Sequence, residues 1–286
     1  MKFIELTPGI YSSSIGFGCS HILGSVNEED SRKAVNVAVG YGINHFDLAR
    51  SYGYGEAESF IGKLLKGKRN QLVLTSKFGI KANWKASIIR PAKPLFRILT
   101  NRNKQSADLS LNSAHKQGNA ISNQFFNRVP INVAEMRISL EESLKALKTD
   151  FLDYFLVHEP LETLSNIEDL MAGFNRLKDE GKIRAFGITY YNSQILFHDS
   201  YLQKFRLHQF DNVAESVLYQ NAVTHRGLSS NIIFSPLKNG NKDLSPSDKL
   251  RKLLTDFPNS VVLASMFNAN HIRQNVDVVK SLMLRE

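Results

Sequence analysis

The chain has 286 residues, 42% of them hydrophobic, and a formal net charge of +9. This length suits one α/β-barrel domain or two ordinary domains, and no linker favours the division, so we expect a single domain over residues 1–286. Lys2 and Glu5 exclude the apolar start of a signal peptide, and no apolar run approaches the roughly 20 residues that cross a bilayer, so we expect a soluble, cytoplasmic protein. The single cysteine, Cys19, excludes an internal disulfide and a cysteine-based metal cluster, and we expect no metal.

Apolar runs of strand length alternate with helical patterns along the chain. Strands are expected at 12–18, 43–49, 72–79, 152–159, 184–191, 213–219, 232–237 and 260–266. Amphipathic helices are expected at 31–42, 56–67, 133–148, 166–182, 247–257 and 271–283. Strands that alternate with helices pair in parallel, and eight such units without a GxGxxG motif favour a closed (β/α)8 TIM barrel over an open doubly wound sheet.

Two connections depart from this alternation. Residues 80–130 form a long loop insertion after the third strand, whose first half is a candidate cap and whose second half, from about Asn101, is a candidate for disorder. The connection from Tyr219 to Ile232 is too short for a full helix. We therefore expect the sixth outer helix to be shortened or missing.

The positive charge is concentrated in the insertion. Between residues 81 and 130 there are nine lysine and arginine side chains but a single acidic one, Asp108. Such a charge fits an anionic substrate, a phosphate, a polyanion or no ligand at all. The segment lacks a compact motif for reading nucleic acid, so we expect a small-molecule substrate and neither a nucleic acid nor a membrane as a partner.

Polar side chains close three successive strands. Asp47, Lys77 and His158 end the second, third and fourth, and Tyr52 follows Asp47 in a glycine-containing turn. The C-terminal ends of barrel strands meet at one mouth, so these groups should lie together. A tyrosine has a reference pKa of about 10 and is a feeble acid unless a cation stabilises its phenolate. We expect Lys77 to lower that pKa, Asp47 to hold Lys77, and His158 to orient a carbonyl oxygen.

Each of these residues also has a structural interpretation when taken alone. Asp47 suits a helix cap or an ion pair, and Lys77 suits the surface end of a strand. Tyr52 suits a surface aromatic, and His158 suits a hydrogen-bonded histidine at a strand end. Their joint occurrence at consecutive strand ends favours an active site.

With these residues in place, the sequence resembles the aldo-keto reductase family. GINHFDLARSYGYGEAE is similar to the family's Asp- and Tyr-bearing stretch, LVLTSKFG to its Lys-bearing strand and LDYFLVHEP to its His-bearing strand. The resemblance implies a barrel that reduces aldehydes and ketones with NADPH, or NADH. It implies catalytic roles for Tyr52, Lys77, Asp47 and His158. A cofactor-binding or regulatory barrel with little activity is the alternative, and docking of the basic insertion on a polyanion is a third.

The resemblance also implies a set of cofactor-binding residues. Thr189 and Tyr190 stand where the family holds the nicotinamide carboxamide, and Ser216 takes the place of a strand-six Gln if Tyr219 stacks on the nicotinamide. The full set is Gly18, Cys19, Ser20, Asp47, Thr189, Tyr190, Ser216, Tyr219, Ser235, Leu237, Ser265, Met266, Arg273 and Asn275. A buried, inert thiol is the other interpretation of Cys19. Trp84 joins Tyr52 and His158 as a candidate for the substrate pocket, with simple packing as its alternative.

Overall fold

Eight parallel strands close into a barrel in the order β10-β11-β12-β3-β4-β5-β8-β9, which confirms the expected (β/α)8 architecture. The computed structural model describes residues 1–89, 122–237 and 241–284. The strands are β3 (Ile15–Gly18), β4 (His45–Asp47), β5 (Val73–Phe78), β8 (Leu152–His158), β9 (Ile183–Tyr190), β10 (Leu207–Asp211), β11 (Asn231–Phe234) and β12 (Val261–Ala264).

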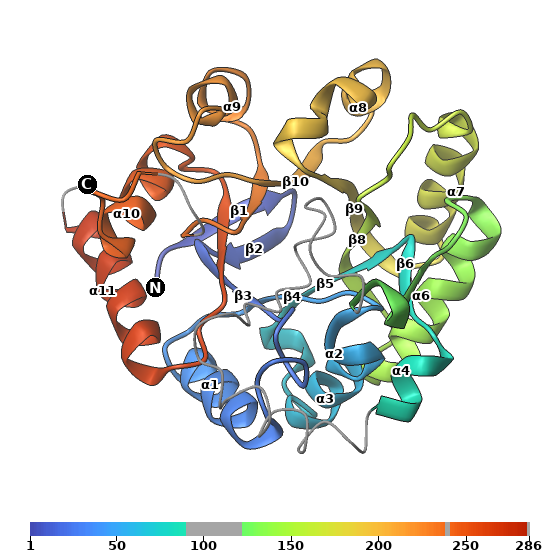
Figure 1. Cartoon of the computed structure of the whole chain (residues 1–286), viewed down its shortest axis with the longest axis horizontal. Coiled ribbons are helices and arrows are strands. Elements are labelled where there is room, and N and C mark those ends of the chain that lie inside the picture. Colours follow the sequence, from blue (N-terminus) through green and yellow to red (C-terminus); the bar gives the residue numbers. More distant parts are fainter. Residues whose placement is uncertain (90–121, 238–240, 285–286) are drawn as a thin grey trace.

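Helices surround the strands (Figure 1). The helix that follows each strand in turn is α1 (Glu28–Gly40), α3 (Ala57–Leu64), α6 (Val133–Leu147), α7 (Ile167–Asp179), α8 (Ile195–Leu202), α9 (Tyr219–Arg226), α10 (Pro246–Asp256) and α11 (Ala269–Met283). Side chains at the N-caps start several of them, because Asn27, Asn132 and Ser245 each accept a hydrogen bond from a backbone N–H of the first turn. No helix in the described ranges has the length and apolar composition needed to cross a bilayer.

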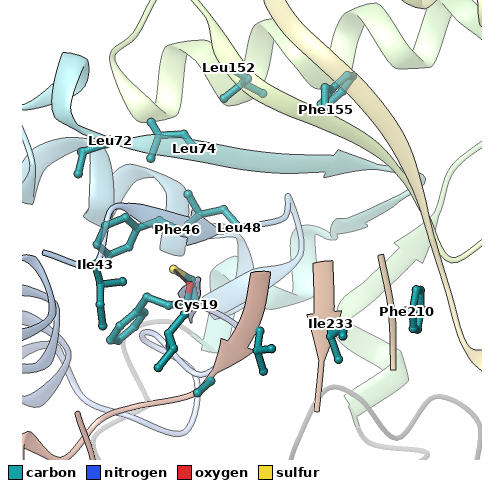
Figure 2. Close-up of a cluster of buried hydrophobic side chains, with 14 of the residues drawn as sticks. Cys19, Ile43, Phe46, Leu48, Leu72, Leu74, Leu152, Phe155, Phe210 and Ile233 are labelled. Carbon is teal, nitrogen blue, oxygen red and sulfur yellow. Dashed lines mark hydrogen bonds between the residues drawn. The ribbon is translucent and has the colours of Figure 1, made fainter. Parts of the chain in front are cut away.

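Every residue of β5 and β8 is buried, because the helices cover the outside of the barrel and side chains fill its inside. The main apolar core lies between the strands and the helices. Figure 2 shows part of it, with Phe46, Leu74 and Phe155 among its side chains. Burying an aliphatic or aromatic side chain of this kind contributes about 1.5–3 kcal/mol. This layer holds the strand ends in a fixed arrangement.

An N-terminal hairpin, which the sequence patterns did not predict, closes one end of the barrel. Its strands β1 (Phe3–Thr7) and β2 (Ile10–Ser13) pair in antiparallel fashion. Ile4, Leu6 and Ile10 share a buried cluster with side chains at the starts of barrel strands. The hairpin therefore plugs the N-terminal end of the barrel. The opposite end, where the strands finish, is left for a site.

The sixth strand differs from the sequence expectation. The run 213–219 is not a strand: β10 ends at Asp211, residues 214–218 form turns, and Tyr219 begins α9. The apolar alternation in that run comes from a turn and a helix start, whereas β10 carries a polar residue, Gln209, that points into the barrel. The sixth outer helix, α9, has eight residues, so it is shortened and not missing.

The two ends of the insertion form a small ribbon at the rim. Strand β6 (Ile80–Ala82) pairs in antiparallel fashion with β7 (Phe126–Arg128), and helix α4 (Trp84–Ile89) follows β6. The ring of Tyr54 stacks on Phe126 and meets Phe125 edge-on. The candidate cap and the disorder expectation concern mainly residues 90–121, which lie outside the described residues.

Two buried histidines should make the fold sensitive to acid. Burial lowers the pKa of His45 to about 3 and that of His208 to about 4, whereas an unfolded histidine titrates near its ordinary value of 6.5. The unfolded chain therefore binds more protons than the folded chain below about pH 6.5, and stability is lost as the pH falls. We expect the free energy of unfolding to fall by about 2 kcal/mol per histidine between about pH 7 and pH 5.

Urea unfolding at several pH values measures this loss. His45→Gln keeps polar groups between Ser12 and Thr75, which contact the ring at 3.0 and 3.1 Å, but it does not titrate. We expect it to reduce the loss between pH 7 and pH 5 by about 2 kcal/mol, the contribution of one buried histidine. His271→Gln changes an exposed histidine and is the matched control. An unchanged pH dependence in His45→Gln would contradict the prediction.

Candidate active site

The ends of three neighbouring strands bring Asp47, Lys77 and His158 to the open end of the barrel. Asp47 is the last residue of β4, Lys77 is the last but one of β5, and His158 is the last of β8. The parallel register pairs Asp47 with Thr75 and Lys77 with Leu156, so these strands finish at similar heights. The polar residues predicted at the strand ends therefore form a spatial cluster.

A tight turn after β4 places Tyr52 beside this cluster. Tyr52 begins the short helix α2 (Tyr52–Gly55), inside which Gly53 and Tyr54 have positive φ angles of 62° and 60°. A Cβ on Gly53 would lie 2.4 Å from the carbonyl oxygen of Ile22, so both the backbone angle and the space require glycine there. The turn brings the phenol of Tyr52 back over the strand ends.

The ammonium of Lys77 is the centre of the cluster. It is buried and donates to both carboxylate oxygens of Asp47, at 2.9 and 2.8 Å, and to the carbonyl oxygen of Leu48 at 2.7 Å. It also lies 3.3 Å from the hydroxyl of Tyr52. A buried ammonium is stable only when it is paired and hydrogen-bonded, and this arrangement meets both conditions.

Gln209 on β10 is part of the same network and was not identified from the sequence. Its side-chain amide donates to Asp47 Oδ1 at 2.8 Å, and its oxygen accepts from the hydroxyl of Thr189 at 2.6 Å. The signal in the sequence was the run LHQFD, because alternate side chains of a strand, here that of Gln209, point into a barrel. Gln209, and not Ser216, is therefore the polar side chain that strand six directs to the mouth.

The pKa of Tyr52 moves in the direction opposite to the one expected. Burial raises it well above the ordinary value, and the neighbouring carboxylates of Asp47 and Glu159 raise it further. The expected decrease in the pKa rested on the pairing with Lys77 alone. Desolvation of the phenol and the two nearby carboxylates act in the opposite direction. Tyr52 therefore holds its proton firmly in the free protein, as a proton donor must.

His158 lies next to Tyr52 with its ring edge-on, and the ring centroids are 6.1 Å apart. Burial lowers the pKa of His158 well below its usual value, and the positive charges of Lys77 and Arg128 lower it further. The imidazole is therefore neutral at neutral pH. A neutral ring carries one donor and one acceptor nitrogen.

A cavity of about 320 Å³ lies against Tyr52, Lys77 and Asp47. Nine of the residues predicted for the site line it, namely Gly18, Ser20, Asp47, Tyr52, Lys77, Thr189, Ser235, Leu237 and Ser265. His21, Glu159 and Gln209 also line it, although the sequence analysis did not select them. The wall offers hydroxyls and one side-chain amide, a donor set that fits the carboxamide of a nicotinamide.

Three predicted cofactor residues are packed in the core and do not line the cavity. Cys19 is fully buried, burial raises the pKa of its thiol well above the usual value, and Sγ lies 3.5 Å from the carbonyl oxygen of Phe17. This agrees with the interpretation of Cys19 as a buried thiol. The hydroxyl of Tyr190 lies 3.0 Å from Nδ1 of His208, and Met266 is buried.

The remaining predicted residues are not part of the cavity lining, and His158, which lies behind Tyr52 and Glu159, is one of them. Ser216 precedes α9. The hydroxyl of Tyr219 donates to Asp256 at 2.7 Å, and this hydrogen bond joins α9 to α10. On α11, Arg273 is exposed and Asn275 is buried. Trp84 is 68% exposed on α4, so the structure does not support a place for it in the pocket. No three His, Cys, Asp or Glu side chains gather as a metal site would require within the described ranges.

Comparison with known proteins identifies the family. The sequence model of the Aldo/keto reductase family matches residues 14–198, more than half of the chain. Aldo-keto reductase YhdN of Bacillus subtilis (strain 168) is 30% identical over 187 residues, which cover 63% of this chain and 44% of that protein. The match therefore spans less than half of this curated relative.

Solved structures share the fold. The holo form of an aldo-keto reductase from Bacillus halodurans superposes with a TM-score of 0.66 at 21% identity, covering 98% of this chain and 91% of that one. An aldo/keto reductase from Klebsiella pneumoniae, in complex with NADP and acetate, gives a TM-score of 0.60 at 17% identity, covering 97% and 89%. From its sequence match and its barrel, this chain belongs to the aldo/keto reductase family.

Proposed function

We propose that the protein is an NAD(P)H-dependent oxidoreductase that reduces the carbonyl of an aldehyde or ketone to an alcohol. The observation that carries the proposal is the Lys77 ammonium, bonded to the carboxylate of Asp47 and 3.3 Å from the phenol of Tyr52, at the wall of a polar cavity. NADPH is the proposed cofactor, with NADH as the other possibility. Family membership and the NADP complex of the Klebsiella pneumoniae relative support this choice.

Tyr52 is the proposed general acid. The bound cofactor would supply a hydride to the carbonyl carbon. Tyr52 donates its proton to the carbonyl oxygen, and Lys77 stabilises the phenolate that remains. A positioned acid of this kind accelerates a reaction by about 10²- to 10⁴-fold. The raised pKa of Tyr52 keeps the proton available for reduction until the oxygen becomes basic enough to take it.

Asp47 and His158 complete the proposed proton-transfer site. Asp47 keeps the ammonium charged and oriented through two hydrogen bonds, and Gln209 holds Asp47 from the other side. His158, being neutral, can direct a ring N–H at the carbonyl oxygen without adding a charge. In this arrangement the proton leaves Tyr52, and the charges of Lys77 and Asp47 stay fixed.

The cavity wall supplies the proposed contacts to the nicotinamide end of the cofactor. Thr189 and Gln209 are hydrogen-bonded to each other at 2.6 Å and lie beside the catalytic cluster. Three further serines of the wall lie in the loops that follow β3, β11 and β12, namely Ser20, Ser235 and Ser265. The hydroxyls and the side-chain amide of these residues can form hydrogen bonds to a carboxamide.

A cofactor titration tests the proposal before any substrate is known. We expect NADPH, and more weakly NADH, to give a saturable change in nicotinamide fluorescence. Ser265→Leu narrows the cavity beside Gly18, where an added Cβ would already lie 3.5 Å from the Ser265 hydroxyl. We expect this variant to weaken binding by about tenfold or more, which is 1.4 kcal/mol.

Tyr219→Phe is the matched control for the titration, because the hydroxyl of Tyr219 bonds to Asp256 and not to the cavity. It should leave the dissociation constant within about twofold of the wild type. The absence of a signal with either nucleotide would contradict the proposal. Saturable binding without turnover of any carbonyl compound would favour a cofactor-binding barrel with little activity.

A further inference from the structure

Glu159, which directly follows His158, has an unusual backbone. Its φ angle is +47°, in the left-handed region that residues other than glycine seldom adopt. Two hydrogen bonds hold it there. Its N–H donates to the carbonyl oxygen of Thr189 at 2.9 Å, and its carbonyl oxygen accepts from Arg128 Nη1 at 2.6 Å. Strained positions that are held from both sides often belong to functional sites.

This backbone directs the carboxylate of Glu159 to the catalytic histidine. Its Oε1 lies 3.9 Å from His158 Nε2, and the side chain lines the cavity. The side chain of Glu159 is 13% exposed and that of His158 is 5% exposed, so water screens the contact only weakly. The distance is longer than a direct hydrogen bond and suits an electrostatic contact or one bridging water.

The other ring nitrogen of His158 has different surroundings. Nδ1 is buried and has no hydrogen-bond partner within the described part of the chain. The positive groups near the ring, Lys77 and Arg128, oppose a second proton, so the ring carries one. The position of that single proton decides whether the nitrogen next to Glu159 is a donor or an acceptor.

Two physical arguments place the proton on Nε2. A buried N–H without a partner is rarer than a buried acceptor without one, so Nδ1 suits the bare nitrogen. A carboxylate attracts an N–H and repels a nitrogen lone pair, so Glu159 favours the proton on the nitrogen that faces it. We infer that Glu159 is a positioning residue that keeps the proton of neutral His158 on Nε2, so that the ring presents a donor to the carbonyl oxygen.

The kinetic part of this inference rests on the proposed function, but the tautomer itself does not. Nitrogen-15 NMR of histidine-labelled, cofactor-free protein at about pH 7 distinguishes a protonated from a bare ring nitrogen, and His158→Gln assigns the signals. We expect wild-type His158 to show a protonated Nε2 and a bare Nδ1. In Glu159→Gln the carboxylate is lost and the amide N–H can donate to Nε2, so we expect a larger population with the proton on Nδ1 than in the wild type.

Turnover provides the second measurement. In the molecules whose Nε2 is an acceptor the carbonyl oxygen loses one donor, so kcat of Glu159→Gln should fall with the Nε2–H population measured by NMR, with KM within about twofold. Glu159→Asp keeps a carboxylate and should keep the wild-type tautomer. Glu162→Gln makes the same charge change at an exposed position of the same loop and should change neither the NMR spectrum nor kcat.

The outcomes separate this inference from the proposed function. A wild-type His158 with its proton on Nδ1, or a Glu159→Gln protein with an unchanged tautomer, overturns the role of Glu159. If Glu159→Gln does not fold, Glu159→Ala is the second variant, and an undiminished Nε2–H population there has the same meaning. A wild-type protein that reduces no carbonyl compound contradicts the proposed function instead, while the spectrum still decides the tautomer.

Discussion

Tyr52→Phe is expected to lower kcat for carbonyl reduction by about 10²- to 10⁴-fold, the contribution of a positioned general acid. The substitution removes the hydroxyl that we propose as the proton donor and leaves the ring in place against His158. The Asp47–Lys77 pair and the hydroxyls of the cavity wall are untouched. The dissociation constant of NADPH should therefore stay within about twofold of the wild-type value. Steady-state kinetics and a fluorescence titration on the same preparation measure both quantities.

Tyr54→Phe is the control for this variant. It removes a phenol from the same turn, and its ring can still stack on Phe126. We expect its kcat to stay within about twofold of the wild type. A Tyr52→Phe protein with the wild-type rate would show that the proton comes from another group.

Lys77→Met is expected to cost both turnover and about 3–5 kcal/mol of the free energy of unfolding. The ammonium is 1% exposed and makes two bonds to Asp47, whose side chain is 4% exposed. Removing one partner leaves the other charge buried without its counter-ion, and this is the costly half of a buried ion pair. Urea unfolding at about pH 7 measures the loss, and the kinetic assay measures the turnover.

The double variant Asp47→Asn/Lys77→Met separates the two effects. It removes both charges, so we expect its free energy of unfolding to be at least about 1 kcal/mol higher than that of Lys77→Met. We expect it to be inactive as well. Lys81→Met breaks a more exposed pair with Glu135 and should cost less than about 1 kcal/mol. Strictly additive losses in the double variant would contradict the coupling between Asp47 and Lys77.

The barrel and the clustering of Asp47, Lys77 and His158 could be predicted because both follow from one rule. Parallel strands joined by helices finish at the same end, so polar residues at strand ends meet. β5 and β8 are apolar enough to be recognised as buried strands, and the polar residues at their C-terminal ends mark the site. Local pattern and global topology agree in this half of the barrel.

The other half was harder to predict because β10 carries polar side chains on both of its faces. In β10, His208 faces the outer layer, where it bonds to Tyr190 and to carbonyl oxygens at the end of α8, and Gln209 faces the interior, where it bonds to Asp47 and Thr189. Polar residues therefore occupy positions where an apolar pattern is expected. Their partners lie far away in the sequence, and a local pattern does not contain them. The apolar pattern therefore placed the sixth strand at 213–219. As a result, Ser216 and Tyr219 were predicted as cofactor-binding residues in place of Gln209.

The pKa of Tyr52 was missed for a related reason. The sequence shows which charges exist, and Lys77 at the end of the next strand suggests a lowered pKa. It does not show how deeply the phenol is buried, nor that the backbone of Glu159 turns its carboxylate towards the same cavity. Desolvation and the position of a strained residue are properties of the folded chain.

The ribbon at the base of the insertion holds the two ends of the insertion together. Ala82 and Phe126 pair directly, so the two points where the segment leaves the barrel are held side by side. The entropic cost of closing a loop between fixed ends grows only slowly with its length. Foreign sequence grafted between these points should therefore leave the barrel folded, which would make this protein a scaffold for displaying new loops beside a preformed cavity.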